Sequence, residues 1–357
     1  MIPDSISEST NLQIVNPLEI QDWDEKALKS PECTFFHSQC WARALSDAYG
    51  YKPVYFVTPA SDAGYARLFA VMDISSFLTG RRGVSLPFSD YCPPIVPQED
   101  REGEFRDILE VAAGHGRNAG WKYLQIRDGR HFPEHAASYS TYYRHTLELL
   151  ENEDLIFKQF QGSTKRNIRK ALRAGLTVSI SNSLDSVLSY FKLHGLLRKR
   201  HGLPSQPLYF FKSIHKNVIG PGKGFVVLAL HNGKPVSGAV FFHFGKKAVY
   251  KYGASDLACQ HLRVNDLVMW EAIRLLARNG FHSLCFGRTD MDNEGLRRFK
   301  SGWGTQESII RYHEIDLKKD KLLTAGGDGA RLARAVMGRM PVPVLNIIGH
   351  LLYRHMG

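Results

Sequence analysis

The residues best suited to chemistry lie in the stretch 281–304, which reads FHSLCFGRTDMDNEGLRRFKSGWG. Residues 284–286 form an apolar run between turn residues, which predicts a short buried strand. Functional side chains of α/β proteins gather beyond the carboxyl ends of such strands. Arg288, Asp290 and Asp292 follow the run, so we expect a cation that orients a phosphate or carboxylate and two carboxylates that can accept a proton.

A helix after this loop should aim one lysine inward. Asn293 or Asp292 can cap it, and Leu296, Phe299 and Lys300 then share a face because residues three and four apart are neighbours. A cation held beside a carbonyl can stabilise a developing oxyanion, so Lys300 is a candidate catalytic group, with Asp290 or Asp292 as proton acceptor. The alternative is an ordinary surface lysine.

The residues that flank Lys300 are expected to bind substrate. Phe299 would shape the donor pocket. Trp303 lies between two glycines, which lets the backbone pass close to a ligand or to a neighbouring strand before an extended pattern resumes at 308–315.

A basic helix is predicted over 160–175, capped by Ser163 or Thr164 and ended by Gly175. Ile168 and Leu172 should face the core. Its five cations repel one another unless an anion is near; they are Lys165, Arg166, Arg169, Lys170 and Arg173. A phosphate-binding helix and a solvated basic face are the two interpretations.

Tyr250 and Tyr252 are expected on one face of their strand, because alternate residues share a face. Their hydroxyls could then bind the same substrate, or the rings could serve ordinary strand packing.

The elements that must position these groups alternate along the chain. Helices are expected at 38–49, 100–119, 183–201, 207–218 and 262–279, and strands at 53–58, 66–73, 122–127, 142–149, 176–180, 225–230, 235–244 and 248–252. Asn232-Gly233 and the turn at 245–247 predict an antiparallel meander. The polar stretch 151–154 separates two α/β halves, which gives domains at 1–149 and 150–317 and a tail at 318–357.

Composition restricts the classes of protein. The 357 residues carry a net charge of +11, which favours polyanionic partners such as RNA, nucleotide diphosphates or an acidic membrane surface. The five cysteines include no C-x-x-C pair and the start lacks the features of a signal peptide, so we expect a cytoplasmic protein. No zinc-ligand spacing occurs among the fifteen histidines, and no metal is predicted.

The tail has its own character. A basic and glycine-rich linker at 318–329 precedes two short apolar and basic helices, at 330–340 and 344–355, split by prolines. Neither is long enough to span a bilayer. We expect them to dock on the protein's own surface, with peripheral contact to the inner membrane as the alternative.

Several of these stretches together resemble one family. The segments 265–270 (NDLVMW), 286–288 (FGR) and 299–304 (FKSGWG), with fainter similarity at 34–41 and 85–91, resemble the FemABX-like branch of the GNAT acyltransferase superfamily. The resemblance implies two tandem GNAT-like domains, each a mostly antiparallel mixed sheet flanked by helices, followed by a helical tail.

The resemblance also implies a function. Members pass an aminoacyl group from charged tRNA to an amine on a peptidoglycan precursor. By the resemblance, Arg166 and Arg169 would contact the diphosphate of a nucleotide-linked precursor, and Asn265 would belong to the substrate-binding set. The long coiled-coil arm of some members has no counterpart here, because the span 184–218 holds only two ordinary helices.

Two alternatives remain. Residues 259–265 read CQHLRVN and hold no glycine where GNAT enzymes that use acetyl-CoA have a glycine-rich turn for the pyrophosphate, which disfavours acyl-CoA as donor. The first alternative is nevertheless acyl-CoA-dependent N-acylation of an exopolysaccharide or amino sugar. The second is a non-catalytic GNAT pair that binds a lipid- or nucleotide-linked envelope precursor or RNA.

Overall fold

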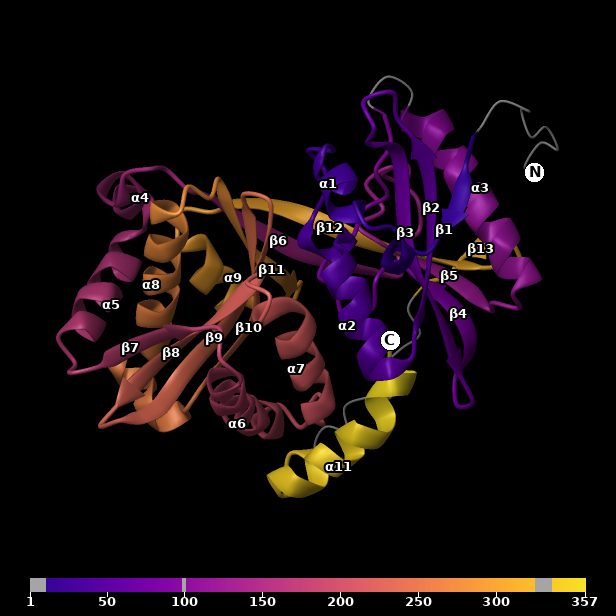
Figure 1. Cartoon of the computed structure of the whole chain (residues 1–357). Coiled ribbons are helices and arrows are strands. Elements are labelled where there is room, and N and C mark those ends of the chain that lie inside the picture. The colour runs from indigo at the N-terminus through magenta and orange to yellow at the C-terminus, as the bar shows by residue number, and fades with distance from the viewer. Residues whose placement is uncertain (1–10, 98–100, 325–335) are drawn as a thin grey trace.

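The computed structural model describes residues 11–97, 101–324 and 336–357 (Figure 1). Its strands are β1 (Gln13–Val15), β2 (Lys52–Pro59), β3 (Tyr65–Ser76), β4 (Gly80–Val84), β5 (Tyr123–Arg127), β6 (Ser140–Glu148), β7 (Thr177–Ser181), β8 (Gly224–His231), β9 (Lys234–Phe244), β10 (Lys247–Ser255), β11 (Ser283–Asp290), β12 (Gln306–Asp316) and β13 (Lys321–Leu322). Its α-helices are α1 (Trp23–Leu28), α2 (Gln39–Tyr49), α3 (Arg101–Asn118), α4 (Glu153–Gln159), α5 (Gly162–Leu172), α6 (Leu184–Arg200), α7 (Leu208–Ile214), α8 (Val264–Arg278), α9 (Glu294–Ser301) and α11 (Val342–Leu352).

The described strands form one continuous sheet in the order β1-β2-β3-β4-β5-β12-β6-β11-β10-β9-β8-β7, with β13 beside β12. Within it, β4 with β5 and β10 with β11 are the parallel neighbours, and the other described pairings are antiparallel. The predicted tandem arrangement of mostly antiparallel sheets flanked by helices is confirmed.

The two halves are joined through β12. This strand follows the second half in the chain, yet it pairs with β6 over its first part and with β5 over its last part. Strand β6 in turn pairs with β11. The boundary predicted at residue 149 therefore falls inside a shared sheet, and the domain limits stay a prediction.

Most predicted elements appear within a few residues of their expected ends. Asn232 and Gly233 both have positive φ angles, 52° and 73°, as a tight hairpin turn with an Asn-Gly pair requires. Five described strands and α-helices were missed: the short β1, α1 and β13, and also β4 and α4. Strand β4 carries two arginines and two glycines, which hides it from propensity, and α4 lies in the polar stretch that we interpreted as a join.

Two helices cover opposite faces of the strands of the second half. Helix α6 packs on β9 and β10, whereas α8 packs on β8 and β9. Helix α7 packs against α2 of the first half (Figure 1). The core between them mixes both halves, since Trp41 and Tyr49 contact Phe210 and Trp41 also contacts Phe242. The halves are therefore packed as one unit.

The tail docks on the protein itself, as expected. Helix α11 packs on α6, and the following residues 353–357 reach the first half. There the Tyr51 hydroxyl donates to the Arg354 carbonyl at 3.0 Å, and Ser76 Oγ lies 3.0 Å from His355 Nδ1. Most of the helix predicted at 330–340 lies outside the described residues. No helix in the described ranges is both long and apolar enough to cross a bilayer.

Candidate active site

An open site lies where β10 and β11 separate. The two strands pair in parallel from Lys247 and Ser283 to Val249 and Cys285, and the pairing ends there. A cavity of about 710 Å³ begins at this point. Its walls come from both strands, from α8 and α9, and from one loop of the first half; the polar groups that matter here are Asp90, Tyr250, Lys251, Asn265, Arg288 and Lys300.

Bulges in both strands shape this cavity. The register of β11 shifts between Cys285 and Arg288, where Gly287 takes a φ of +68° that favours glycine. A Cβ on Gly287 would lie 3.2 Å from Asp90 Oδ2, so the missing side chain also makes room for that carboxylate. The register of β10 shifts between Tyr250 and Tyr252, which makes Lys251 the extra residue.

Lys300 is the buried cation of the site. Asn293 caps α9 by accepting from the Leu296 amide at 3.1 Å, as expected, and Lys300 falls on the inner face with 2% of its surface exposed. Its ammonium donates to the carbonyls of Gly287 at 3.1 Å and Arg288 at 2.9 Å. These two bonds use two of its three donors. Burial lowers its pKa to about 8, while Asp90 opposes the shift.

Asp90 and Lys251 form a buried ion pair across the two halves. Lys251 Nζ lies 3.1 Å from Asp90 Oδ2, and its side chain is 6% exposed. The same ammonium lies 5.5 Å from the ring centre of Phe36 and 5.2 Å from that of Tyr252. Burial lowers the pKa of Lys251, and the Asp90 carboxylate counteracts it. The cavity wall therefore holds one carboxylate, Asp90, and two lysines whose pKa values are lowered by burial.

Arg288 lies flat between two aromatic rings at the cavity wall. Its guanidinium is 4.5 Å from the Tyr142 ring centre and 5.4 Å from that of Tyr312, and Nη1 donates to the Tyr312 hydroxyl at 3.0 Å. The Tyr312 hydroxyl donates to the Asp90 carbonyl at 2.7 Å. The residue remains exposed to the cavity, so a planar fork with free edges is available for an anion.

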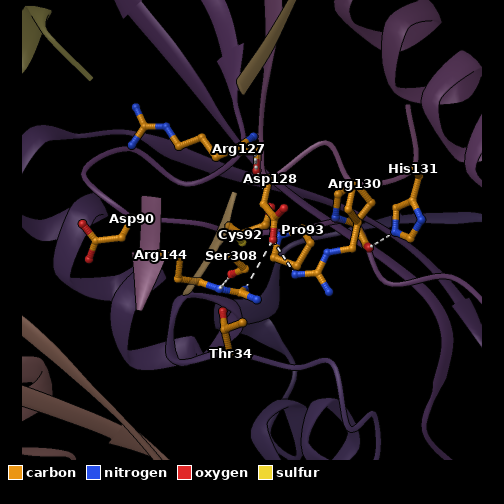
Figure 2. Close-up of polar contacts among 12 residues, drawn as sticks. Thr34, Asp90, Cys92, Pro93, Arg127, Asp128, Arg130, His131, Arg144 and Ser308 are labelled. Carbon is orange, nitrogen blue, oxygen red and sulfur yellow. Dashed lines mark hydrogen bonds and ion pairs between the residues drawn. The ribbon is translucent and has the colours of Figure 1, made fainter. Parts of the chain in front are cut away.

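A separate cluster of charged side chains lies where the two halves share the sheet. Figure 2 shows Asp128 between Arg130 and Arg144, while the Asp90 carboxylate points the other way. Arg144 also donates to Ser308 Oγ of β12 at 3.1 Å. Asp128 is buried and takes a φ of +75°. Because these arginines are engaged with Asp128, we assign this cluster to holding the shared sheet together.

A second cavity of about 400 Å³ adjoins the first. The two share Gln260, Asn265, Gly295 and Phe299. The second cavity lies at the start of α8 and is lined by two cations, Arg263 and Arg298, and by polar groups of α5, namely Ser163, Thr164 and Asn167. The Asp266 carboxyl group also lines it and accepts a hydrogen bond from Asn167 at 3.3 Å. Arg263 has a φ of +61° at the start of α8. The arrangement suits a phosphate-bearing ligand.

The structure brings some predicted site residues to the cavity. Lys300, Phe299, Arg288, Tyr250 and Asn265 all line it. Asn265 accepts a hydrogen bond from Ser237 Oγ at 2.8 Å. Burial raises the pKa of Tyr250 to about 12.

Two aromatic predictions need correction. Tyr250 and Tyr252 do not share a face, because the bulge at Lys251 turns them to opposite sides: Tyr250 packs with Phe241 and Phe286, and Tyr252 with Phe211 and Phe242. Trp303 is not at the cavity either. It is fully buried, and its ring centre lies 5.0 Å from that of Phe160.

The glycines around Trp303 serve close packing against helices. A Cβ on Gly302 would lie 2.6 Å from Thr164 Oγ1, and one on Gly304 would lie 2.7 Å from the Gln159 carbonyl oxygen. The backbone therefore passes close to the ends of α4 and α5, not to a ligand or a neighbouring strand.

The charged predictions outside α9 also shift. Asp290 and Asp292 are exposed and are not among the residues that line the cavity, whereas Asp90 is. Arg166 and Arg169 are exposed on α5 and line neither cavity; the cations that line the second cavity are Arg263 and Arg298. Leu172 is exposed, contrary to expectation, and α5 begins after Gln161.

Comparison with known proteins now bears on this geometry. Residues 158–301, which contain α5, α8, α9 and Lys300, match the family described as acetyltransferase (GNAT) domain. This stretch of the second half is similar to a GNAT domain. The crystal structure of FemX matches with a TM-score of 0.66 at 14% identity, covering 85% of this chain and 97% of FemX. The part of the chain that this match covers has the FemX fold.

Other relatives are more distant or more partial. UDP-N-acetylmuramoylpentapeptide-lysine N(6)-alanyltransferase of Weissella viridescens is 25% identical over 96 residues, a match that spans 27% of this chain and only 28% of that enzyme. The C-terminal domain of a putative lysylphosphatidylglycerol synthetase from Agrobacterium fabrum matches with a TM-score of 0.52 at 14% identity, over 89% of this chain and 95% of that one. These structural likenesses concern the fold.

Sequence reasoning missed Asp90 and Lys251 as site residues. Asp90 lies in the segment 85–91 that contributed to the family resemblance, but nothing local shows that it faces a strand 161 positions later. Lys251 had a signal: a cation amid the apolar run VYKYG marks a bulge or a buried charge. No group of three metal-ligating side chains occurs within the described ranges.

Proposed function

We propose that this protein transfers an aminoacyl group from charged tRNA to an amine of a cell-envelope precursor, with a peptidoglycan precursor as acceptor. One observation carries the proposal: a buried lysine, Lys300, in the wall of a 710 Å³ cavity that also holds a carboxylate, Asp90. The GNAT domain and the FemX fold support acyl transfer, and the printed activity of the partial relative supports the acceptor class.

In the proposed reaction the acceptor nitrogen attacks the ester carbonyl of the aminoacyl donor. The new C–N bond forms as the ester C–O bond breaks, and the released ribose hydroxyl takes up a proton. Lys300 stabilises the negative charge that develops on the carbonyl oxygen, because its ammonium is fixed by two carbonyls and removed from bulk water.

The amine must lose a proton as it attacks. Asp90 is the carboxylate of the cavity and takes the role that the sequence suggested for Asp290 or Asp292. Its partner Lys251 lies 3.1 Å away and holds the Asp90 side chain in the cavity wall. Asp90 can then accept the proton directly or receive it through the acceptor's own groups.

The two adjoining cavities suit two substrates. The phosphates of the donor end would lie at Arg263 and Arg298 in the second cavity, and its acyl group would pass Phe299 to reach Lys300. Arg288 would hold a phosphate or carboxylate of the acceptor. The chain's net charge of +11 supports a polyanionic donor.

Donor dependence tests the proposal. Purified protein receives either labelled aminoacyl-tRNA or labelled acyl-CoA, with UDP-N-acetylmuramoyl pentapeptide or an amino-sugar polymer as acceptor, and label is followed into amide. The Lys300→Ala protein serves as the control for contaminating activity. Label from tRNA in the pentapeptide is the expected result. Transfer from acyl-CoA alone would move the function to N-acylation of an amino sugar, and silence with both donors would favour a binding protein.

A further inference from the structure

The outer face of α11 is apolar and uncovered by the rest of the described chain. Val344, Ile347 and Leu351 recur at helical spacing and are 40%, 62% and 61% exposed. The inner face carries Leu345 and Gly349, and a Cβ on Gly349 would overlap the Ser205 carbonyl oxygen. The helix is thus fully docked on one side and presents aliphatic side chains to solvent on the other.

A second exposed apolar element contacts the residues that follow this helix. The turn between β3 and β4 carries Phe77, which is 87% exposed, and Leu78, which is 56% exposed. The Phe77 ring centre lies 4.7 Å from that of His355 in the tail, and the neighbouring Met356 is also exposed. In Figure 1, α11 and the far end of the β3–β4 hairpin both lie along the lower side of the molecule.

The charges around these apolar residues are positive. Of the four arginines in the segments 77–82 and 336–357, Arg82 is buried and Arg81 pairs with Asp73, which leaves Arg339 and Arg354 to face solvent; neither segment contains an aspartate or glutamate. Arg339 and Arg354 are exposed on the tail, and Lys122 is exposed beside the hairpin, where its Nζ donates to the Thr79 carbonyl at 3.2 Å. An apolar face bordered by cations complements an anionic lipid surface more closely than it complements another basic copy of this chain.

Hydrogen bonds to the rest of the protein fix the position of the tail that carries this apolar surface. Arg82 donates to the carbonyls of His355 and Gly357 at 2.8 and 2.6 Å, and Arg198 donates to the Tyr353 hydroxyl at 2.9 Å. These contacts tie the tail to both halves without using the exposed side chains. Docking would therefore require little ordering of the chain, which reduces its entropic cost.

We propose that α11 and the β3–β4 turn together form a membrane-docking surface, which places Val344, Ile347, Leu351 and Phe77 in the interfacial layer of an anionic bilayer. An eleven-residue helix is too short to span, so α11 would lie in the plane of the surface. The inference does not depend on the transfer reaction, because none of these residues lines either cavity.

Vesicle flotation of the full chain tests this proposal. The vesicles contain phosphatidylglycerol and phosphatidylcholine in equal parts, or phosphatidylcholine alone. We expect binding to the anionic vesicles that weakens with salt, and a roughly tenfold or larger loss for Ile347→Glu with Leu351→Glu, since two aliphatic groups no longer enter the interface. Phe77→Ser should weaken binding by a smaller factor.

The matched control is Ile14→Glu, a similar change at a residue 49% exposed on β1. It should bind as the original chain does, and thermal melting confirms that each variant is folded. Equal flotation of the α11 double variant and the original chain would overturn the proposal. A lack of vesicle binding by the original chain would also overturn it. The same conclusion would hold if gel filtration then showed a dimer that the α11 substitutions dissociate.

Discussion

The two parallel strand pairs of the sheet, β4 with β5 and β10 with β11, begin alike and end differently. Each pair is short, and in each the strands separate toward their carboxyl ends. Beyond β4 and β5 the space is closed by the segment 85–92: the Ser85 amide donates to the Gln125 carbonyl at 2.8 Å, and the Cys92 amide donates to the Arg127 carbonyl at 2.9 Å. Beyond β10 and β11 it stays open as the larger cavity.

The difference shows how one half serves the other. The segment that closes the first pair carries Asp90 at its far end and delivers this carboxylate to the cavity of the second pair. Bulges at Lys251 and Gly287 keep the second pair open and turn polar groups inward. The first half therefore has no open cavity beyond β4 and β5, and its segment 85–92 forms part of the wall of the cavity in the second half.

Removal of the lysine should have the largest effect. Lys300→Ala should lower kcat about 100- to 1,000-fold, as expected for loss of a group that stabilises an oxyanion. KM for the acceptor should change little. Steady-state kinetics of aminoacyl transfer checks this, with thermal melting as a control, because Lys300 also supports the bulge through two carbonyls. A folded variant with near-normal kcat would contradict the assignment.

Asp90→Asn should follow in size. We expect a loss of about 100-fold or more in rate, as for removal of a general base. The variant also leaves Lys251 buried without its partner, at a cost of about 3–5 kcal/mol in unfolding free energy. Adding Lys251→Met should restore most of that stability but not the rate, and this is measured by denaturant unfolding beside kinetics.

Asp128→Asn provides the matched control for Asp90. This carboxylate is also buried, with 4% of the residue exposed against 8% for Asp90, and it pairs with Arg130 and Arg144 where the two halves share the sheet. It is not among the residues that line the cavity. It should lose comparable stability and keep the rate of the folded enzyme. Equal rate losses in both variants would mean that the closed and open strand pairs do not differ in function.

The pH dependence separates two roles for Lys300. Burial depresses its pKa from 10.5 to about 8, so the ammonium that stabilises the oxyanion is present below pH 8 and is lost above it. We expect kcat to fall by about tenfold per pH unit on the alkaline side, after correction for hydrolysis of the ester donor. Lys300→Arg should abolish this alkaline fall in kcat, because arginine stays charged in this pH range. A rate that rises through pH 8 would indicate that the neutral amine acts as a base.

The smallest expected effect is that of Gly287→Ala. A left-handed conformation costs alanine about 1–2 kcal/mol, and the added Cβ also approaches Asp90 Oδ2 at 3.2 Å. Gly222→Ala is the control, since its φ of +78° is similar and nothing lies within 4 Å of the new Cβ. Gly287→Ala should lower the free energy of unfolding more than Gly222→Ala does, because only its Cβ approaches Asp90. Only Gly287→Ala should also slow transfer.

The sequence revealed what local spacing decides. Helix spacing alone placed Lys300 and Phe299 on one inward face, and turn residues located the meander. Tyr252 was misplaced because a single-residue bulge reverses the alternation of a strand, and a bulge depends on partners that the strand itself does not show. Trp303 was mistaken for a ligand contact because its glycines accommodate helices that lie far away in the sequence.

The shared strand β12 has a consequence for how the chain folds. It occupies an interior position between β5 and β6, yet it is synthesised after both of them and after every strand from β1 to β11. Until it arrives, the first half keeps unpaired strand edges at β5 and β6, which are prone to aggregation. The two GNAT-like halves should therefore fold in one late cooperative step, and a fragment that ends at residue 149 should fail to fold stably on its own.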